Sequence, residues 1–313
     1  MNNKLLFFLG ISGLFVGCIA PREITNSGKV TPKGNVVAYG TQTYNFSSIP
    51  FQKVAGLTGI DISQMNVVTS DTLSAEQQNA AIANWSKVGE AAIANSVDPV
   101  GAGINFGMRY GIANRFDIGY KRAPHANVVD VQYQFLGSIG NVGDDFAASS
   151  KWYGSVGLQY SSQEVNLPKW AGPIANRLGF GLGRKDILVP LTFSRSLGNE
   201  ETFGALSFGV VYGRSNIEYH SNSSVYGTFT NLSGQVVVAN LNALDRNVSF
   251  NTFGFFASAK LGYKYIYIVP AFALYYQNYG VYGNVVGNDF GMKGITLVPS
   301  IGVRLRLGKN SVK

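Results

Sequence analysis

Few side chains in this sequence belong to the types that carry out nucleophilic chemistry. The two histidines are the strongest candidates. His220 is followed by Ser221 and lies close to Ser223, and a histidine within hydrogen-bond reach of a serine can activate it as a nucleophile. His125 instead follows Pro124 in a short turn. One histidine beside several serines in a polar connection is equally typical of a solvated loop. We therefore predict no catalytic site and no enzymatic activity.

The sequence lacks the residue patterns that bind metal ions or phosphate groups. The chain contains two histidines and a single cysteine, Cys18, so no cluster has the spacing of a zinc site. No glycine-rich loop with a following lysine stands after an expected strand, as phosphate binding requires. The sequence predicts neither a metal nor a cofactor.

The basic residues are scattered along the chain. Lys and Arg number 25 against 17 Asp and Glu, which leaves a net charge of +8. A protein that binds nucleic acid groups its basic residues into a patch or stripe that meets the phosphates, whereas here they occur singly. We expect no nucleic-acid partner.

Several charges alternate with apolar residues, and this alternation indicates the element that positions them. In residues 104–111 the apolar side chains Ile, Phe, Met and Tyr alternate with Asn, Gly, Arg and Gly. Successive side chains of a β-strand point to opposite faces, so this run predicts a strand with one apolar and one polar face. When the other segments are sorted in the same way, eight charged side chains share the polar, inward face: Arg109, Asp117, Lys121, Asp130, Lys260, Lys264, Arg304 and Arg306.

The strands that carry these charges are separated by turns rich in glycine. Only 13% of residues are charged, while 38 are Gly, 17 are Tyr and 20 are Phe, which suits a barrel with aromatic residues at its ends. The predicted strands are residues 35–46, 101–111, 116–121, 129–135, 152–161, 186–195, 202–217, 250–264, 265–278 and 295–307. We predict an all-β fold, an antiparallel transmembrane β-barrel of about ten strands, within a range of 8–12.

The connections between these strands divide into two sets. On one side lie a short turn at 124–126 and the long segments 47–99, 163–185, 218–249 and 279–294. The other side has 112–115, 138–151, 196–201 and a turn near Tyr263. Outer-membrane barrels have long external loops and short periplasmic turns, so both ends of the barrel are expected on the periplasmic side.

The first long loop, 47–99, contains the one expected helix. Residues 73–95 have a helical composition, with Ala81, Trp85, Val88 and Ala92 on one face. This face is expected to pack on the rim or to plug the lumen, and binding of a partner is the alternative.

The N-terminus has the pattern of an export signal. Lys4 precedes an apolar stretch, residues 5–16, of the length found in secretory signals. Residues 14–18 (Leu-Phe-Val-Gly-Cys) resemble the bacterial lipobox, which implies a signal peptide of residues 1–17 and lipidation of Cys18; cleavage after Ala20 is the alternative. Residues 18–34 are then expected to be a lipid-anchored tether, with the lipid in the inner leaflet, ahead of a barrel domain of residues 35–313.

Two runs resemble a known group of proteins. Residues 107–119 resemble the strand, tight turn and strand of many bacterial outer-membrane β-barrel proteins. Residues 130–136 resemble the following strand in members with a lipoprotein-type signal peptide. The resemblance covers residues 22–137 and implies a barrel in the cell outer membrane, with outer-membrane lipid as its partner. It implies no activity, because one fold supports many functions.

Three functions fit these features. The inward Arg and Lys side chains predict a structural barrel or a narrow, porin-like pore whose basic lumen attracts small anionic solutes, although ten strands enclose little more than their own side chains. Long loops rich in Asn, Ser, Gly and Tyr suit the binding of surface ligands or adhesion. The third is a soluble lipocalin-like or β-sandwich lipoprotein that is held at the membrane by Cys18.

Overall fold

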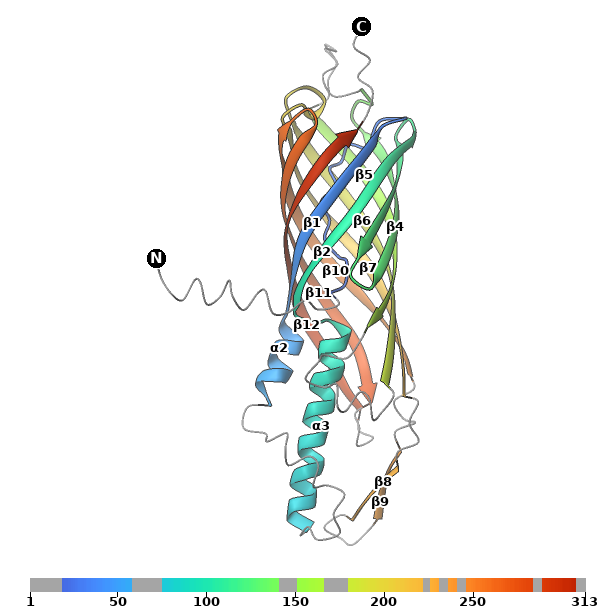
Figure 1. The fold of residues 1–313 in the computed structure, drawn as a ribbon, viewed down its shortest axis with the longest axis vertical. Coiled ribbons are helices and arrows are strands. Elements are labelled where there is room, and N and C mark those ends of the chain that lie inside the picture. Colours follow the sequence, from blue (N-terminus) through green and yellow to red (C-terminus); the bar gives the residue numbers. More distant parts are fainter. Residues whose placement is uncertain are drawn as a thin grey trace, which may run out of the picture.

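Ten of the alternating segments form the strands of one closed barrel, and two helices and a small hairpin extend from one end (Figure 1). The computed structural model describes residues 19–57, 75–140, 151–165, 180–221, 226–230, 236–240, 246–283 and 289–307. The barrel strands are β1 (Val36–Ser47), β2 (Gly101–Ala113), β3 (Phe116–Ala123), β4 (Ala126–Leu136), β5 (Trp152–Val165), β6 (Phe180–Leu197), β7 (Gly204–Ser221), β10 (Arg246–Tyr263), β11 (Ile266–Gly283) and β12 (Asp289–Leu307).

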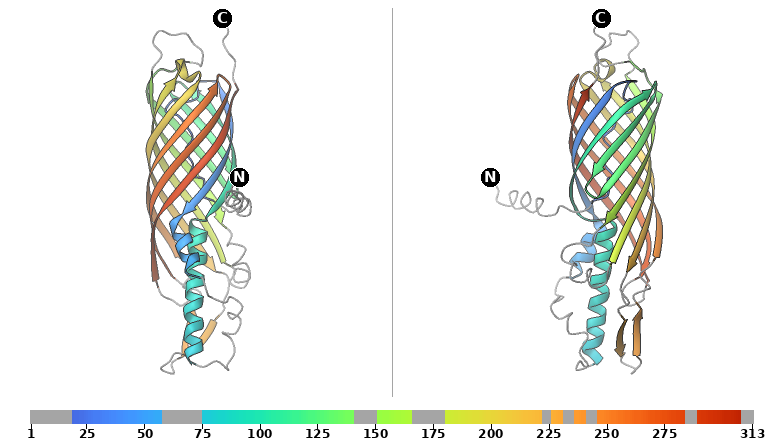
Figure 2. Two further views of the ribbon diagram at one scale, coloured as in Figure 1. Left: turned by 90° about the vertical axis from the view of Figure 1, so that its left-hand side faces the viewer. Right: turned by 45° about the vertical axis from the view of Figure 1, so that its right-hand side comes forward.

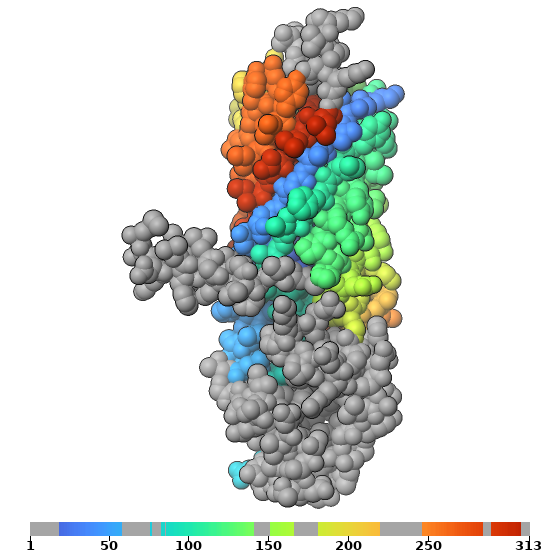
Figure 3. All heavy atoms as spheres, in the orientation of Figure 1, coloured from blue at the N-terminus to red at the C-terminus, as the bar shows by residue number. Residues whose placement is uncertain are grey.

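Each barrel strand pairs in an antiparallel manner with its neighbours in the chain. The cylinder closes where β1 pairs with β12, with Val36 opposite Leu307 and Phe46 opposite Leu297. Figure 3 shows β1 lying directly against β12 on one side and β2 on the other. The predicted antiparallel barrel of ten strands is therefore confirmed.

The barrel turns its apolar side chains outward. In β2, the side chains of Ile104, Phe106, Met108 and Tyr110 are 47–65% exposed, whereas that of Arg109, which alternates with them, is 2% exposed. A sandwich or a lipocalin buries its apolar faces, so the soluble alternative is wrong. An apolar outer band around a polar interior is the arrangement of a transmembrane β-barrel.

The strands end at two different rims. At the rim that we call the turn rim, the connections are 114–115, 137–151, 198–203 and 264–265, and β1 begins and β12 ends there. At the opposite rim, the loop rim, the connections are 48–100, 124–125, 166–179, 222–245 and 284–288. Each connection falls on the side predicted for it.

The wall of the barrel is uneven in height at the loop rim. β6, β7, β10 and β11 have 18 residues each and β12 has 19, whereas β3 has 8. A strand rises about 3.3 Å per residue, and the long strands extend past the β3–β4 hairpin (Figure 2). Their predicted ranges were too short because outward polar residues such as Lys185 and Glu218 interrupt the alternation near the loop rim.

Two helices and a hairpin lie beyond the loop rim: α2 (Ser48–Ala55), α3 (Ala75–Val97), and β8 (Tyr226–Thr230) paired with β9 (Val236–Asn240) (Figures 1 and 2). The helix predicted at 73–95 is confirmed as α3, whereas α2 and the hairpin were not predicted. Lys53 of α2 is 2.6 Å from Glu90 of α3, which ties the helices together. Among the helices that the structure describes, none has the length and apolar character needed to cross a membrane.

Residues 19–34, which we call the plug, run through the lumen (Figure 1). The sequence predicts a lipid-anchored tether over residues 18–34, and in the structure residues 19–31 are buried apart from the half-buried Asn26. The chain then reverses through Gly34, whose φ of 81° suits a residue without a Cβ, and enters β1. The predicted signal peptide and Cys18 lie outside the described residues.

Candidate functional site

The plug is irregular in structure, and the inner wall of the barrel supplies hydrogen-bond partners for its backbone. The Tyr275 hydroxyl donates to the Arg22 carbonyl oxygen at 2.5 Å, and the Gly28 amide donates to Ser194 Oγ at 3.0 Å. A buried backbone group without a partner costs free energy, so these bonds make an irregular segment tolerable inside the barrel. Further bonds to the plug backbone come from Asp117, Gln132, Gln134 and Gln159.

Arg109 is held between two carboxylates of neighbouring strands. Its Nη2 lies 2.5 Å from Asp117 Oδ1, and its Nη1 lies 2.5 Å from both oxygens of Asp130. Gly119 makes this approach possible, because a Cβ at that position would lie 2.3 Å from Asp130 Oδ1. The guanidinium is therefore paired with two carboxylates, so this site carries no excess positive charge that would attract an anion.

Lys121 of β3 pairs with the plug. Its Nζ lies 2.8 Å from Glu23 Oε1, which also accepts a hydrogen bond from Asn105 Nδ2 at 2.6 Å. All three side chains are buried. Removal of one partner from such a pair leaves an unpaired buried charge, so the pair fixes the position of the plug against the wall.

The turn of residues 198–203 closes the lumen at the turn rim. Glu200 accepts a hydrogen bond from Lys29 of the plug, and Glu201 accepts one from Lys260 of β10. Both glutamates are almost fully buried and have positive φ values, 49° and 62°, which residues other than glycine rarely adopt. Burial alone would raise the pKa of Glu200, but the adjacent Lys29 lowers it. The strained turn thus directs two carboxyl groups into the lumen.

Asp98, the first residue after α3, joins several elements at the loop rim. Its Oδ1 accepts hydrogen bonds from Arg22 of the plug at 3.2 Å and from Asn45 of β1 at 2.9 Å. Its Oδ2 accepts hydrogen bonds from Gln277, Tyr279 and Thr296. Burial alone would raise the pKa of Asp98, but Arg22 and Arg184, together with the hydroxyl hydrogen bonds, lower it to about 2. Asp98 therefore stays ionised and links α3 to the plug and the wall.

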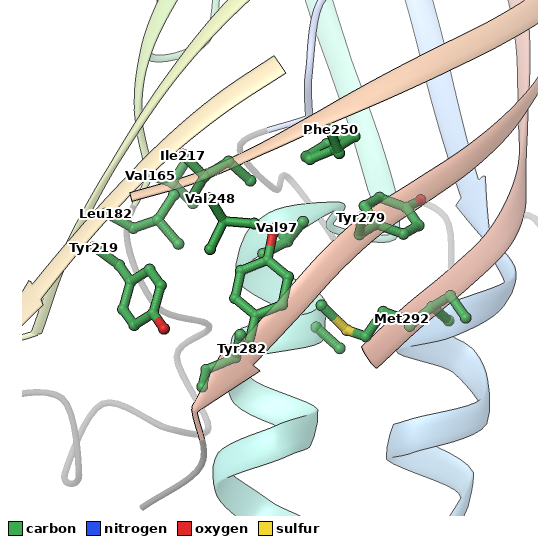
Figure 4. Packing of buried hydrophobic residues seen from close by; sticks show 13 residues of the cluster. Val97, Val165, Leu182, Ile217, Tyr219, Val248, Phe250, Tyr279, Tyr282 and Met292 are labelled. Carbon is green, nitrogen blue, oxygen red and sulfur yellow. The ribbon is translucent and has the colours of Figure 1, made fainter. Parts of the chain in front are cut away.

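The C-terminal end of α3 is seated in the mouth of the barrel. Arg184 of β6 donates from Nη1 to the Val97 carbonyl oxygen at 2.5 Å, and a cation at this end of a helix is stabilising. An apolar cluster surrounds the helix end and closes the mouth (Figure 4). Its members are Ile49, Ile93, Ala94, Val97, Val165, Leu182, Ile217, Tyr219, Val248, Phe250, Tyr279, Tyr282 and Met292.

The charged residues predicted on the inner face lie there with one exception. Arg304 reaches the plug, with its Nη2 2.9 Å from Asn26 Oδ1, and Arg306 lines the lumen close to it. Lys264 is the exception and corrects the prediction. It lies in the turn between β10 and β11 with a φ of 51°, and its Nζ is 5.1 Å from the centre of the Tyr263 ring. The chain reverses at residues 264–265, so Lys264 no longer follows the alternation of the strand.

The sequence did not identify the groups that balance these charges. They are the carboxylates Glu23, Asp98, Asp186, Glu200 and Glu201; the buried cations Arg22, Lys29 and Arg184 were not identified either. One signal was present: the charges assigned to the inner face were mostly basic, so further carboxylates were needed in the lumen. Which segment would supply them depends on contacts between residues far apart in the chain. In the described residues the lumen is close to neutral, where the sequence predicted a basic one.

Two cavities lie inside the barrel among the residues that the structure describes, and both are small. One cavity of about 30 Å³ is lined by Glu23, Tyr39 and Arg109, among others, and one of about 40 Å³ by Lys29 and Arg304, among others. Such volumes hold a few water molecules. They are too small for an organic solute.

Groups suited to catalysis or metal binding are sparse in the part of the chain that the structure describes. His125 is exposed in the β3–β4 turn, and His220 belongs to β7, with its side chain outside the described residues. Within the described ranges, no three His, Cys, Asp or Glu side chains form a group that could hold a metal ion.

Comparison with known proteins gives similarity of structure alone. No protein-family model matches the chain, and no curated protein matches its sequence. Similar solved structures include the Neisserial surface protein A (8% identity, 87% of this chain and 95% of that chain, TM-score 0.30). OprG from Pseudomonas aeruginosa is 8% identical over 91% of this chain and 100% of that chain, with a TM-score of 0.29. Ail, the attachment invasion locus protein of Yersinia pestis, is 9% identical over 87% and 97%, with a TM-score of 0.27. These are bacterial outer-membrane barrels, and likeness at this level assigns no role to this chain.

Proposed function

We propose that this chain is an integral outer-membrane protein whose barrel is sealed by its own N-terminal segment. Its proposed role is that of a structural protein at the cell surface. The observation that carries the proposal is the plug, which is buried in the lumen and paired with the wall through Lys121 and Glu200. The interior of a small barrel is already narrow enough for side chains to fill. A chain threaded through it leaves no channel for solutes.

The apolar exterior and the export signal predicted at residues 1–17 support placement in the outer membrane. In such barrels the long connections face outward. On this basis the loop rim, with α2, α3 and the β8–β9 hairpin, faces the outside of the cell. We assign the protein no enzymatic activity, cofactor or nucleic-acid partner.

We also propose that Cys18 carries lipid. Mass spectrometry of the N-terminal peptide of the mature protein tests this point. The expected result is a peptide that begins at Cys18 and carries the added mass of acyl chains. A free N-terminus at Pro21 would contradict it and would support cleavage after Ala20.

Electrical recording in planar lipid bilayers tests the sealed lumen. The purified full chain is expected to give no steady conductance, whereas a variant that lacks residues 19–31 is expected to conduct. A second variant, Glu23→Gln with Lys29→Gln, loosens the plug without removing it and is expected to open intermittently. Steady open channels from the full chain would overturn the proposal.

Binding at the surface is a second candidate function. The observation that favours it is the projection of α2, α3 and the β8–β9 hairpin beyond the loop rim, with Phe51 of α2 73% exposed. Removal of residues 222–245, which connect β7 and β10, leaves the residues of both strands in place and is expected to reduce attachment of intact cells to a surface. Removal of residues 141–150, from a connection at the opposite rim, is the matched control. Unchanged attachment after the first deletion would exclude this connection as the binding element.

A further inference from the structure

We propose that the chain threads its own barrel from the cell surface inward, so that the chain immediately before Ile19, including Cys18, emerges in the outer leaflet of the outer membrane. The inference rests on the proposed function, in which the loop rim faces outward. It places the lipid anchor on the opposite side of the membrane from the inner leaflet that the sequence predicts.

The contacts of the plug define its direction. Near its beginning, Arg22 pairs with Asp98 at the loop rim. Further along, Lys29 pairs with Glu200 in a connection of the turn rim. At its end, Lys33 forms a parallel bridge with Gly111 of β2, a strand that itself runs from the loop rim to the turn rim. The plug therefore enters at the loop rim and ends at the turn rim.

Ile19 marks the point of entry. A Cβ at Gly103 would lie 3.1 Å from Ile19 Cδ1 and 3.5 Å from Pro124 Cγ, so Ile19 lies beside the β3–β4 turn. The Ile19 carbonyl oxygen also accepts a hydrogen bond from Gln163, near the loop-rim end of β5. Ile19 thus lies where the wall of the barrel is lowest.

The low part of the wall ends at the level of the bilayer surface. The outward face of β3 changes from apolar Ile118 to Tyr120, whose hydroxyl donates to Asn127, and then to Arg122, which also donates to Asn127. A tyrosine followed by polar groups is typical of the membrane–water interface. Ile19, the first residue of the plug, therefore lies near the level of the bilayer surface.

The proposal puts residue 18 within reach of the lipid. Consecutive Cα atoms are about 3.8 Å apart, and Ile19 itself lies beside the β3–β4 turn. Taller strands rise farther round the barrel wall, with the exposed pairs Lys185–Glu218 and Arg246–Asp289 near their loop-rim ends. Acyl chains on Cys18 would extend from the point of entry into the outer leaflet, and the anchor and the projecting helices would lie on the same side of the membrane.

A short epitope inserted between Cys18 and Ile19 of the full chain tests the threading. Intact cells are stained with an antibody that does not cross the outer membrane, before and after permeabilisation. The expected result is strong staining of intact cells that rises little on permeabilisation. Staining that appears only after permeabilisation would overturn the inference. A cysteine inserted at the same point and labelled with a membrane-impermeant maleimide repeats the test with a reagent too small to be blocked by the rim.

Two control insertions separate this inference from the proposed function. An epitope within residues 231–235, in the connection of the loop rim, should stain on intact cells, and one after Lys313 only after permeabilisation. If the first control stains and the Cys18 insertion does not, the threading is wrong while the orientation of the barrel stands. If the two controls exchange their behaviour, the proposed orientation is wrong, and the inference fails with it.

Discussion

At the scale of single residues, Asp98 is the group that most directly couples the plug to the rest of the fold. Asp98→Asn keeps the size of the side chain but removes the negative charge that faces Arg22. It also replaces one of the two carboxylate oxygens that accept hydrogen bonds by an amide group that can only donate. Removal of one partner of a buried ion pair costs about 3–5 kcal/mol, and we expect a loss of this order in the free energy of unfolding. Urea titration of the protein in lipid vesicles measures it. Glu218→Gln, in the exposed pair with Lys185, is the control and should cost about 0–1 kcal/mol.

The lowered pKa of Asp98 predicts how its contribution depends on pH. The pKa falls from 3.8 to about 2 in the folded state, so the ionised carboxylate stabilises the fold fully above pH 4. This contribution is lost as the pH falls through the window from 4 to 2. We expect the difference in the free energy of unfolding between the wild type and Asp98→Asn to shrink across this window. A difference that stays constant between pH 7 and pH 2 would contradict the assignment.

Gly111 allows the plug to lie against the wall where it turns into β1. A Cβ at Gly111 would lie 2.1 Å from the Pro32 carbonyl oxygen, so Gly111→Ala must displace the plug or strain β2. Overpacking of this kind costs about 1–3 kcal/mol. We expect a lower temperature for the heat-induced change in mobility on SDS gels. Gly183→Ala is the matched control, since the nearest atom to its Cβ would be 3.9 Å away, and an equal shift there would count against the explanation.

At the scale of elements, the strands could be predicted from the sequence and the plug could not. The face of each residue in β2 follows from the local pleat of the chain, so the alternation around Arg109 was sufficient to assign it to the lumen. The plug has no such period, and its Gly, Ser, Asn and Pro residues match the composition of a solvated linker. It is ordered by partners such as Asp98 and Lys121, which are distant in sequence. Glu200 was missed for the same reason, because a turn residue gives no sign that it points inward.

The helix α3 was likewise predictable in part: its position in the sequence was predicted, but its packing was not. Its existence followed from composition, but the seating of its end in the mouth of the barrel depends on distant strands. Ile93, which is buried in the apolar cluster, should therefore matter more to stability than Phe51, which is exposed on α2. We expect Ile93→Ala to cost about 2–5 kcal/mol and Phe51→Ala less than about 0.5 kcal/mol by urea titration. Equal costs would mean that the end of α3 does not close the mouth.

At the scale of the whole molecule, the protein consists of three concentric layers, and the polarity of each layer matches its surroundings. Apolar side chains face outward, the inner wall is polar, and the plug fills the space that the wall encloses. Charge is balanced locally in this arrangement, since each buried carboxylate lies near a cation of another element or of the same strand. Loss of the plug should therefore change the permeability of the barrel more than its net internal charge.

This balance predicts the ion selectivity of an opened barrel. Without residues 19–31 the wall retains the cations Arg109, Lys121, Arg184, Lys260, Arg304 and Arg306 and an equal number of carboxylates, Asp98, Asp117, Asp130, Asp186, Glu200 and Glu201. The deletion variant should therefore show a reversal potential close to zero in a gradient of potassium chloride.

Further substitution of Glu200 and Glu201 by Gln should make the opened barrel select chloride. It would leave Lys260, Arg304 and Arg306 without compensation at the turn rim, and rings of basic side chains favour anions. Since the pore would be narrow and poorly screened at low salt, the shift should be largest there and decline as salt rises. If the variant that lacks only residues 19–31 already selects chloride, the prediction is wrong. The basic side chains of the wall would then dominate the electrostatic field in the lumen despite the paired carboxylates.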